Sequence, residues 1–308
     1  MPAIPVALLP CSVYDRRQLK KGINALLESL HFSVGQGCTV LLKPNLVSGR
    51  GHDGLACTNP EFVAATAELF LDYGARVRIG DSPAFGTALD AMFRCGYNEA
   101  LSSLPVEQIN FSKGPLIPLP GGVSVRIARE ALDCDLLVNL PRVKAHAQLR
   151  ITLAVKNLFG TVLGWQKPVL HMRLGNKDNA FARMVVEIAA LYPSAFHLAD
   201  GVIAMHRNGP ITGTPLSLGL IGAAANPVAL DTALLAVIGA RPDASPIWQE
   251  CNQRHLPGSA LQDLSFPLFF PEQLKVQNFI LPASLHPVRF HPLNMGAITI
   301  EGHHCDAM

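Results

Sequence analysis

The 308 residues are 49% hydrophobic and 16% charged, a composition that excludes a disordered or low-complexity protein and is typical of a well-packed globular one. A formal net charge of +2 excludes the broad basic field that drives non-specific nucleic-acid binding, so we expect no nucleic-acid partner. The length allows two domains of roughly 150 residues or one large α/β domain.

The seven cysteines predict a protein without a disulfide framework. Their number is odd and no C-x-x-C spacing occurs, which also argues against a zinc ribbon and a self-contained iron–sulfur motif. The N-terminal segment is apolar and lacks a positively charged start, so it predicts a strand and not a signal peptide. We therefore expect reduced thiols and a cytoplasmic location.

Strands and helices alternate in the first third of the chain. Residues 4–9, 38–43 and 75–80 are short apolar runs that predict buried strands, and the segments 15–31 and 59–74 between them predict helices. This β-α-β-α-β order predicts parallel strands joined by right-handed crossovers.

The remainder is less regular but continues the mixed pattern. In chain order we predict a helix at 85–97, short strands within 106–126, a strand at 135–140, a helix towards the end of 148–159, a helix at 178–191, strands at 195–199 and 216–222, and a helix at 227–238. The fold class is therefore α/β, with a mostly parallel sheet and helices on both faces. Two lobes with a cleft between them are an alternative layout.

One apolar stretch, residues 215–240, has the hydropathy of a membrane helix. Asp231 lies near its middle, however, and burying it at the bilayer centre would cost roughly 2.5–3.5 kcal/mol. A strand, a turn and a helix capped by Asn226 explain the stretch better, so we expect no membrane partner.

We divide the chain into one α/β domain over residues 1–255 and a C-terminal extension over 256–308. The region 106–130 is interpreted as an insertion or a lobe boundary within the domain. The extension is rich in Pro, Phe and His, and short strands near 287–291 and 296–300 are expected to pack it on the domain.

Polar side chains follow four of the predicted strands at the point where each strand ends. They are Lys43 and Asn45 after 38–43, Asp81 and Ser82 after 75–80, Arg142 after 135–140, and Asp200 after 195–199. In open parallel sheets, ligands bind beyond the carboxyl ends of the strands, so these side chains are expected to face one cleft. The alternative is that the loops are polar because loops lie at the surface.

The first two pairs each have a functional and a structural interpretation. Lys43 and Asn45 can offer a positive charge and amide donors to an anion, or the lysine can meet water at the strand end. Asp81 and Ser82 can bind a metal or accept a substrate hydroxyl, or they can form a helix cap or a turn. No metal site is predicted from them.

The segment 141–171 is basic and contains no acid, so it needs an external anion or distant carboxylates. Lys144 and His146 are two residues apart and point to the same face of an extended segment. Lys156 stands among apolar residues, where burial lowers a lysine pKa and suits a base, a nucleophile or an anion clamp. The alternative is a lysine that snorkels to the surface. The cations of this segment are Arg142, Lys144, His146, Arg150, Lys156, Lys167 and His171.

Four common catalytic motifs are absent from the sequence. No P-loop, no G-x-G-x-x-G after the first strand, no H-E-x-x-H and no G-x-S-x-G occurs. The ATPase, classical NAD-dependent, zincin and α/β-hydrolase interpretations therefore lose their main support.

Several stretches, in order, resemble the domain-of-unknown-function family numbered 362, over about residues 40–240. They are LLKPNLV, TNPEFVAA, RIGDSP, LVNLPRVKAHAQLRITLAVKNLFGTVLGWQKPVLH, ADGVIAMHRNGPITGTP and ANPVALDTALLAVIG. The resemblance implies an α/β domain without a settled activity. Many members are linked to a four-iron–four-sulfur ferredoxin module whose closely spaced cysteines this chain lacks, so a partner would have to supply the cluster. Relatives usually carry an acidic residue where this chain has His206.

Two classes of function remain, and the sequence names neither a cofactor nor an oligomeric state. The first is an enzyme that binds a small anionic substrate or cofactor precursor in a Lys/His-rich cleft at the strand ends. The second is a non-catalytic accessory or binding protein that serves a redox or cofactor-delivery partner. For the enzyme, we predict catalytic roles for Lys144, His146 and Lys156 and ligand-binding roles for Lys43, Asn45, Asp81, Ser82, Arg142, Asn157, Lys167, His171 and Asp200. A closed pocket with perturbed pKa values would favour the enzyme, and a flat apolar patch the accessory protein.

Overall fold

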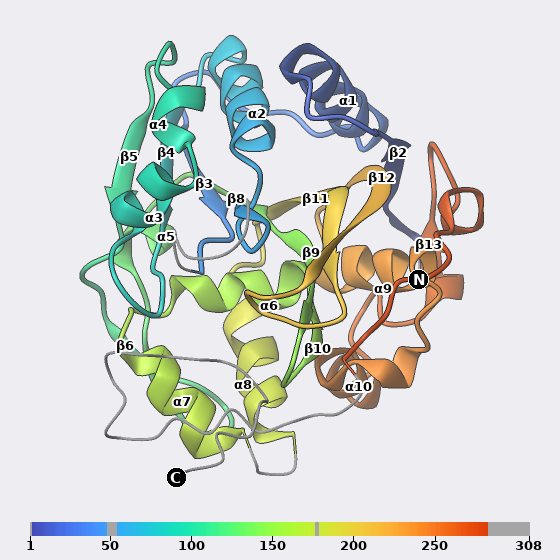
Figure 1. Ribbon diagram of the computed structural model, residues 1–308. Helices are drawn as coiled ribbons and strands as arrows, with labels where there is room; N and C mark the ends of the chain where they lie inside the picture. The colour runs from blue at the N-terminus through green and yellow to red at the C-terminus, as the bar shows by residue number, and fades with distance from the viewer. Residues whose placement is uncertain (1, 48–53, 176–178, 283–308) are drawn as a thin grey trace, which may run out of the picture.

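The computed structural model describes residues 2–47, 54–175 and 179–282. Within these residues, nine strands form one sheet in the order β10–β9–β11–β8–β3–β4–β5, with β12 beside β11 and β2 beside β12 (Figure 1). The strands are β2 Ala7–Pro10, β3 Thr39–Pro44, β4 Arg76–Asp81, β5 Glu107–Asn110, β8 Leu136–Leu140, β9 Arg142–His146, β10 Arg150–Thr152, β11 Phe196–His206 and β12 Thr214–Ala224.

Helices cover both faces of the sheet, with α1 and α2 on one side and α6 and α8 on the other (Figure 1). Successive residues of a strand point to opposite faces. In β3, Val40 and Leu42 accordingly pack with α1 and α2, whereas Leu41 packs with the other helix layer. The helices are α1 Arg16–Ser29, α2 Pro60–Asp72, α3 Ala88–Arg94, α4 Tyr97–Ala100, α5 Arg129–Leu132, α6 Ala154–Leu158, α7 Gln166–Leu174, α8 Ala180–Ala189, α9 Pro227–Val237 and α10 Pro246–Gln253.

The α/β class and the mostly parallel sheet are confirmed. Strands β5, β4, β3 and β8 pair in parallel, and β11 runs parallel to both β8 and β9. Asn59 caps α2, since its side chain accepts a hydrogen bond from the amide of Glu61. The polar strand ends of β3 and β4 therefore lie side by side at one edge of the sheet.

The prediction that the first strand joins the parallel set is wrong. Strand β2 lies antiparallel to β12, with Leu9 opposite Ile221. The reason is that β11 continues for 11 residues and turns into β12 as an antiparallel hairpin. The outer edge of this hairpin then offers β2 its only partner in the described sheet.

Two segments that follow predicted strands are themselves strands. Residues 142–146 form β9, and residues 200–206 form the second half of β11, which pairs with β9 on one side and β12 on the other. Backbone pairing on both sides keeps Asp200 and Gly201 extended despite their turn-forming character. As a consequence, Lys144 and His146 stand on a strand and not on a loop.

The remaining short elements lie outside this sheet. Strands β6 (Leu116–Pro118) and β7 (Ser124–Arg126) form a separate hairpin within the region 106–130, and β1 (Ile4–Pro5) pairs with β13 (Leu264–Ser265). The strands predicted near 287–291 and 296–300 lie outside the described residues. Among the described helices, none has the length and apolar character needed to span a bilayer.

Candidate active site in a lysine-rich pocket

A pocket of about 130 Å³ opens at the carboxyl ends of β3, β4 and β9, where α6 and α7 pass over them. All but three of the predicted site residues line it: Asn45, Asp81, Ser82, Lys144, His146, Lys156, Asn157, Lys167 and His171. The sequence prediction missed the apolar part of the lining, which includes Phe85, Phe159 and Pro210. Phe159 follows Lys156 by three residues, a spacing that places side chains next to each other on a helix and could have signalled this contact.

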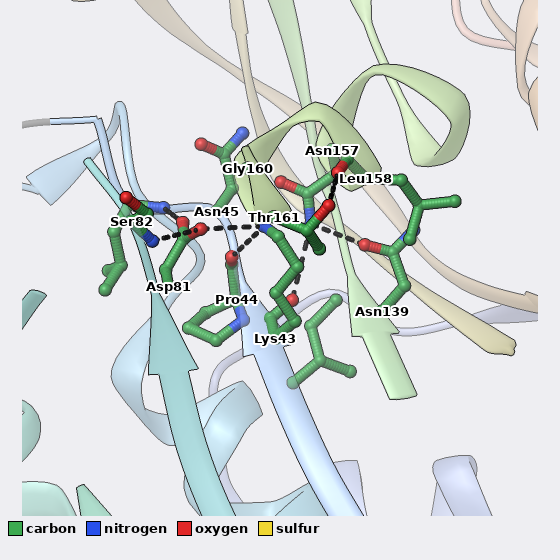
Figure 2. A network of polar contacts seen from close by, with 12 residues as sticks. Lys43, Pro44, Asn45, Asp81, Ser82, Asn139, Asn157, Leu158, Gly160 and Thr161 are labelled. Atoms are coloured by element: carbon green, nitrogen blue, oxygen red, sulfur yellow. Dashed lines mark hydrogen bonds and ion pairs between the residues drawn. The ribbon is translucent and has the colours of Figure 1, made fainter. Parts of the chain in front are cut away.

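An ion pair between Lys43 and Asp81 forms the floor beneath the pocket (Figure 2). The Lys43 Nζ lies 3.0 Å from Asp81 Oδ1 and donates to the Pro44 carbonyl oxygen at 3.1 Å, and the lysine side chain is 0% exposed. The two carboxylate oxygens also accept from the amides of Leu46 and Ser82. The expectation that Lys43 contacts a ligand anion is therefore wrong, because its charge is already compensated and shielded from the pocket.

Gly160 is the residue that allows the chain to close over this ion pair. A methyl group at this position would overlap Nζ of Lys43 and Oδ1 of Asp81, so no larger residue fits without displacing the pair. Figure 2 shows the backbone at Gly160 directly beside both side chains.

Lys144 and Lys167 line the pocket, and neither has a carboxylate partner among the described residues. The Lys144 Nζ donates to Ala56 O at 2.7 Å and Asn45 Oδ1 at 3.2 Å, and the Lys167 Nζ donates to Ser82 O and Gly160 O. These acceptors are neutral, so they do not balance an ammonium charge, and burial lowers the pKa of each lysine to about 7. An ammonium group has three donors, which leaves one on each lysine for a ligand.

Lys156 is half-buried, and its Nζ lies 3.9 Å from the ring centre of Phe159 and 5.4 Å from that of Phe181. It makes no hydrogen bond or ion pair with any residue in the part of the chain that the structure describes. Burial, reinforced by the charges of Lys167 and Lys144, holds its pKa well below the ordinary value. The nitrogen faces the pocket beneath aromatic rings, which favours the functional interpretation over a snorkelling lysine.

The two histidines of the pocket are neutral. One presents an N–H donor and the other a lone pair. The Nδ1 of His146 accepts from the amides of Gln148 and Leu149 at 3.1 and 3.2 Å, which places its proton on Nε2. The Nδ1 of His171 lies 2.5 Å from Gln148 Oε1, an acceptor, so this ring keeps its lone pair on Nε2. Burial and then the Lys156 charge hold both histidine pKa values well below the ordinary value. His146 is thus a donor, and His171 is the candidate base.

Arg142 and Asp200 do not line the pocket, contrary to expectation. The Arg142 guanidinium donates to Cys57 O at 2.7 Å and to Ile203 O, and Asp200 accepts from the Tyr14 hydroxyl at 2.7 Å and the Asn59 amide. Arg142 lies two residues before Lys144 on β9. The backbone around Cys57 covers it there. Both side chains hold neighbouring backbone segments against the sheet.

A buried polar network holds α6, which carries Lys156 and Asn157. The Asn157 Nδ2 donates to Asn139 Oδ1 at 2.8 Å and Lys43 O at 3.3 Å, and Asn139 in turn donates to Ala154 O (Figure 2). At the start of α6, the Asp231 carboxyl group accepts from the amides of Ala154 and Val155. This bond explains why an acid interrupts the apolar stretch 215–240.

Asp231→Ala is expected to lower the free energy of unfolding by about 2–4 kcal/mol, because it leaves the two amides of α6 buried without acceptors. Asp231→Asn keeps one oxygen as an acceptor but turns an NH2 group towards the other amide, so it should recover only part of this loss. Urea unfolding of both variants measures the difference. Equal stability of the alanine variant and the wild type would contradict this role.

No group of three or more His, Cys, Asp or Glu side chains within the described residues is placed to hold a metal ion. The six cysteines in this part of the chain form no disulfide bond with one another. The polar groups of the pocket are mainly donors, which suits an anion better than a cation.

Comparison with known proteins places the chain in a family. A family model described as "Domain of unknown function (DUF362)" matches residues 40–236. The chain belongs to this family. The pocket residues named above all fall within the matched range, so the site is part of the DUF362 domain.

One relative of this DUF362 protein covers nearly the whole chain. The thylakoid-associated protein sll1697 of Synechocystis sp. (strain ATCC 27184 / PCC 6803 / Kazusa) is 37% identical over 290 residues, which cover 92% of this chain and 90% of that protein. Among solved structures, the lactate racemase apoprotein from Thermoanaerobacterium thermosaccharolyticum matches with 9% identity and a TM-score of 0.48 over 77% of this chain. This chain spans 57% of the racemase chain.

Proposed function

We propose that this protein is an enzyme that binds a small anionic substrate or cofactor precursor in the lysine-rich pocket. The observation that carries the proposal is a charge imbalance. Lys144 and Lys167 line the pocket without a counter-charge, and the one carboxylate that the described residues place there, Asp81, is already paired with Lys43. A bound carboxylate or phosphate would supply the missing negative charge.

The pocket groups divide naturally into binding and proton-transfer roles. Lys144 and Lys167 each keep one donor for the anion, and His146 offers its Nε2–H to a further oxygen. Lys156 and His171 keep free lone pairs and would move a proton. The volume of about 130 Å³ lies below the roughly 300–1,000 Å³ of pockets for drug-sized ligands, which favours a substrate of few heavy atoms.

A thermal-shift screen tests the proposed function. The wild-type protein is melted with inorganic phosphate, mono-, di- and tricarboxylates, and nucleotides, at constant ionic strength. We expect at least one small anion to raise the melting temperature, because a ligand that binds only the folded state stabilises it by mass action. Superimposed melting curves with every anion would contradict the proposal.

Anion binding is expected to weaken as the pH rises above about 7. Burial lowers the pKa of Lys144 and Lys167 to about 7, so at higher pH both amines must take up a proton when an anion binds. Affinity should fall by up to about tenfold per pH unit for each lysine that contacts the anion, since one pKa unit corresponds to about 1.4 kcal/mol. Dissociation constants measured at pH 6, 7, 8 and 9 check this. A dissociation constant that does not change over this pH range would contradict the expected pH dependence.

The second candidate is a non-catalytic accessory protein for a redox or cofactor-delivery partner. It is favoured by large apolar side chains at the surface, since Phe93 is 69% and Trp165 is 72% exposed. A partner would cover such side chains. The same screen separates the two candidates, because an accessory protein of this kind needs no response to small anions. The absence of disulfide bonds among the described cysteines fits a reducing, cytoplasmic compartment for either candidate.

A further inference from the structure

We propose that Lys156 forms a Schiff base with the carbonyl group of a small substrate that also carries a carboxylate or a phosphate. This reaction rests on the proposed function, since the anionic group would bind Lys144 and Lys167. The proposal adds the substrate class, an anionic aldehyde or ketone, and assigns Lys156 as the nucleophile.

Lys156 differs from the three other lysines at the pocket in having no polar partner. Lys43 pairs with Asp81, and Lys144 and Lys167 each donate to two oxygens. Lys156 contacts only aromatic rings among the described residues, with Nζ 3.9 Å from the centre of Phe159. A partnerless amine that faces a cavity is placed for attack and not for structural support.

The surroundings of Lys156 favour its neutral, nucleophilic form. The face of Phe159 favours an ammonium group. Loss of solvation and repulsion from the charges of Lys167 and Lys144 oppose it. The pKa of Lys156 lies well below the ordinary value for these reasons. A lysine desolvated beside other cations is an established way to obtain a reactive amine at neutral pH.

The two histidines complete the chemistry of this step. His171 and Lys156 share contacts with Phe159 and Phe181, and the His171 ring lies 4.1 Å from that of Phe181. The Lys156 charge acts on the pKa of both His171 and His146, as expected for close neighbours. His171 has a free lone pair on Nε2, whereas His146 has an N–H to offer.

The reaction balances without an oxidant or reductant. The Lys156 Nζ attacks the carbonyl carbon, and the carbonyl oxygen develops negative charge that the His146 Nε2–H stabilises. His171 takes a proton from the attacking nitrogen and passes it to this oxygen, giving a carbinolamine. The C–O bond then breaks as the hydroxyl leaves as water with one proton from solvent, and the nitrogen lone pair forms the C=N bond of the iminium.

Reductive trapping tests the proposal. The full-length protein is incubated with pyruvate, 2-oxoglutarate or dihydroxyacetone phosphate in the presence of cyanoborohydride, and peptides are mapped by mass spectrometry. We expect at least one of these probes to label Lys156 at least tenfold more than the exposed Lys21 and Lys113. Acetone, which has the carbonyl but no anionic group, should label Lys156 at least tenfold less than that probe does.

Two variants sharpen the test. Lys156→Met should lose the adduct, and Lys144→Met should need at least tenfold more probe for the same labelling; melting curves verify that both variants fold. Equal labelling of Lys156, Lys21 and Lys113 in the wild type would overturn the proposal, and this comparison needs no variant. A rise in melting temperature with one of the three carbonyl probes, without labelling of Lys156 by any of them, would overturn the Schiff base alone. Absence of both effects would overturn the proposed function as well.

Discussion

Asp81→Asn is expected to lower the free energy of unfolding by about 3–5 kcal/mol, on the order of 10 °C in melting temperature. The reason is that the substitution removes one partner of a buried ion pair and leaves Lys43, which is 0% exposed, without a counter-charge. It also removes an acceptor from the backbone amides of Leu46 and Ser82. Urea unfolding and thermal melting both report this loss.

Two further variants separate the charge effect from other causes. Asp90→Asn breaks the exposed pair of Asp90 with Arg94 and should cost less than about 1 kcal/mol. Lys43→Met combined with Asp81→Leu removes both buried charges and should recover the part of the loss that comes from the unpaired lysine, but not the part that comes from the amides of Leu46 and Ser82. If Asp81→Asn and Asp90→Asn lowered the free energy of unfolding by equally small amounts, the buried ion pair would not stabilise the site.

Lys144→Met is expected to weaken anion binding by at least tenfold, because a charge-assisted contact contributes roughly 1.5–3 kcal/mol. About 1.4 kcal/mol corresponds to one order of magnitude in affinity. Methionine has a similar length but no donor, so it removes the contact while filling the space. Binding is measured by titration of the anion that gives the largest thermal shift with the wild type.

The stability of the Lys144→Met variant should change little. Losing a buried, poorly balanced charge is favourable, whereas Ala56 O and Asn45 Oδ1 lose their donor. Lys21→Met, at an exposed position of α1, is the matched control and should bind the anion as the wild type does. Undiminished affinity in Lys144→Met would remove this lysine from the anion site.

The edge of the sheet that carries the pocket could be predicted from the sequence. Apolar runs that end at Lys43 and at Asp81 mark parallel strands, and the basic segment after 140 marks the side chains that face them. The ion pair between Lys43 and Asp81 could also be predicted from the sequence. Strands β3 and β4 are neighbours with Leu42 opposite Ile79, which brings their next polar residues together at the strand ends. The sequence does not reveal that Lys43, at the end of a strand, is fully buried.

The course of β11 could not be predicted from local signals. Asp200 and Gly201 favour a turn, and only pairing with β9 and β12 keeps them in a strand. Gly201 serves close packing here, since a methyl group at this position would approach the backbone oxygen of Leu220 to 3.0 Å. The same tertiary contacts carry Asp200 away from the pocket and towards Tyr14.

The protonation of the histidines also needed the structure. The sequence predicts a catalytic role for His146 and a ligand-binding role for His171, whereas the hydrogen bonds make His171 the candidate base. The amides of Gln148 and Leu149 occupy the lone pair of His146, whereas the Gln148 side chain fixes the proton of His171. One glutamine position thus assigns opposite roles to the two rings, which no residue spacing reveals.

The most direct test of the central claim is proton uptake on anion binding, measured by isothermal titration calorimetry at pH 8 in buffers with different ionisation enthalpies. With the pKa of Lys144 and Lys167 near 7 in the empty pocket, both amines are mostly neutral at this pH. An anion that binds them should restore their charge, so we expect a clear net uptake of protons in the wild type and a smaller uptake in Lys144→Met. Binding heats that are identical in all buffers would contradict the account.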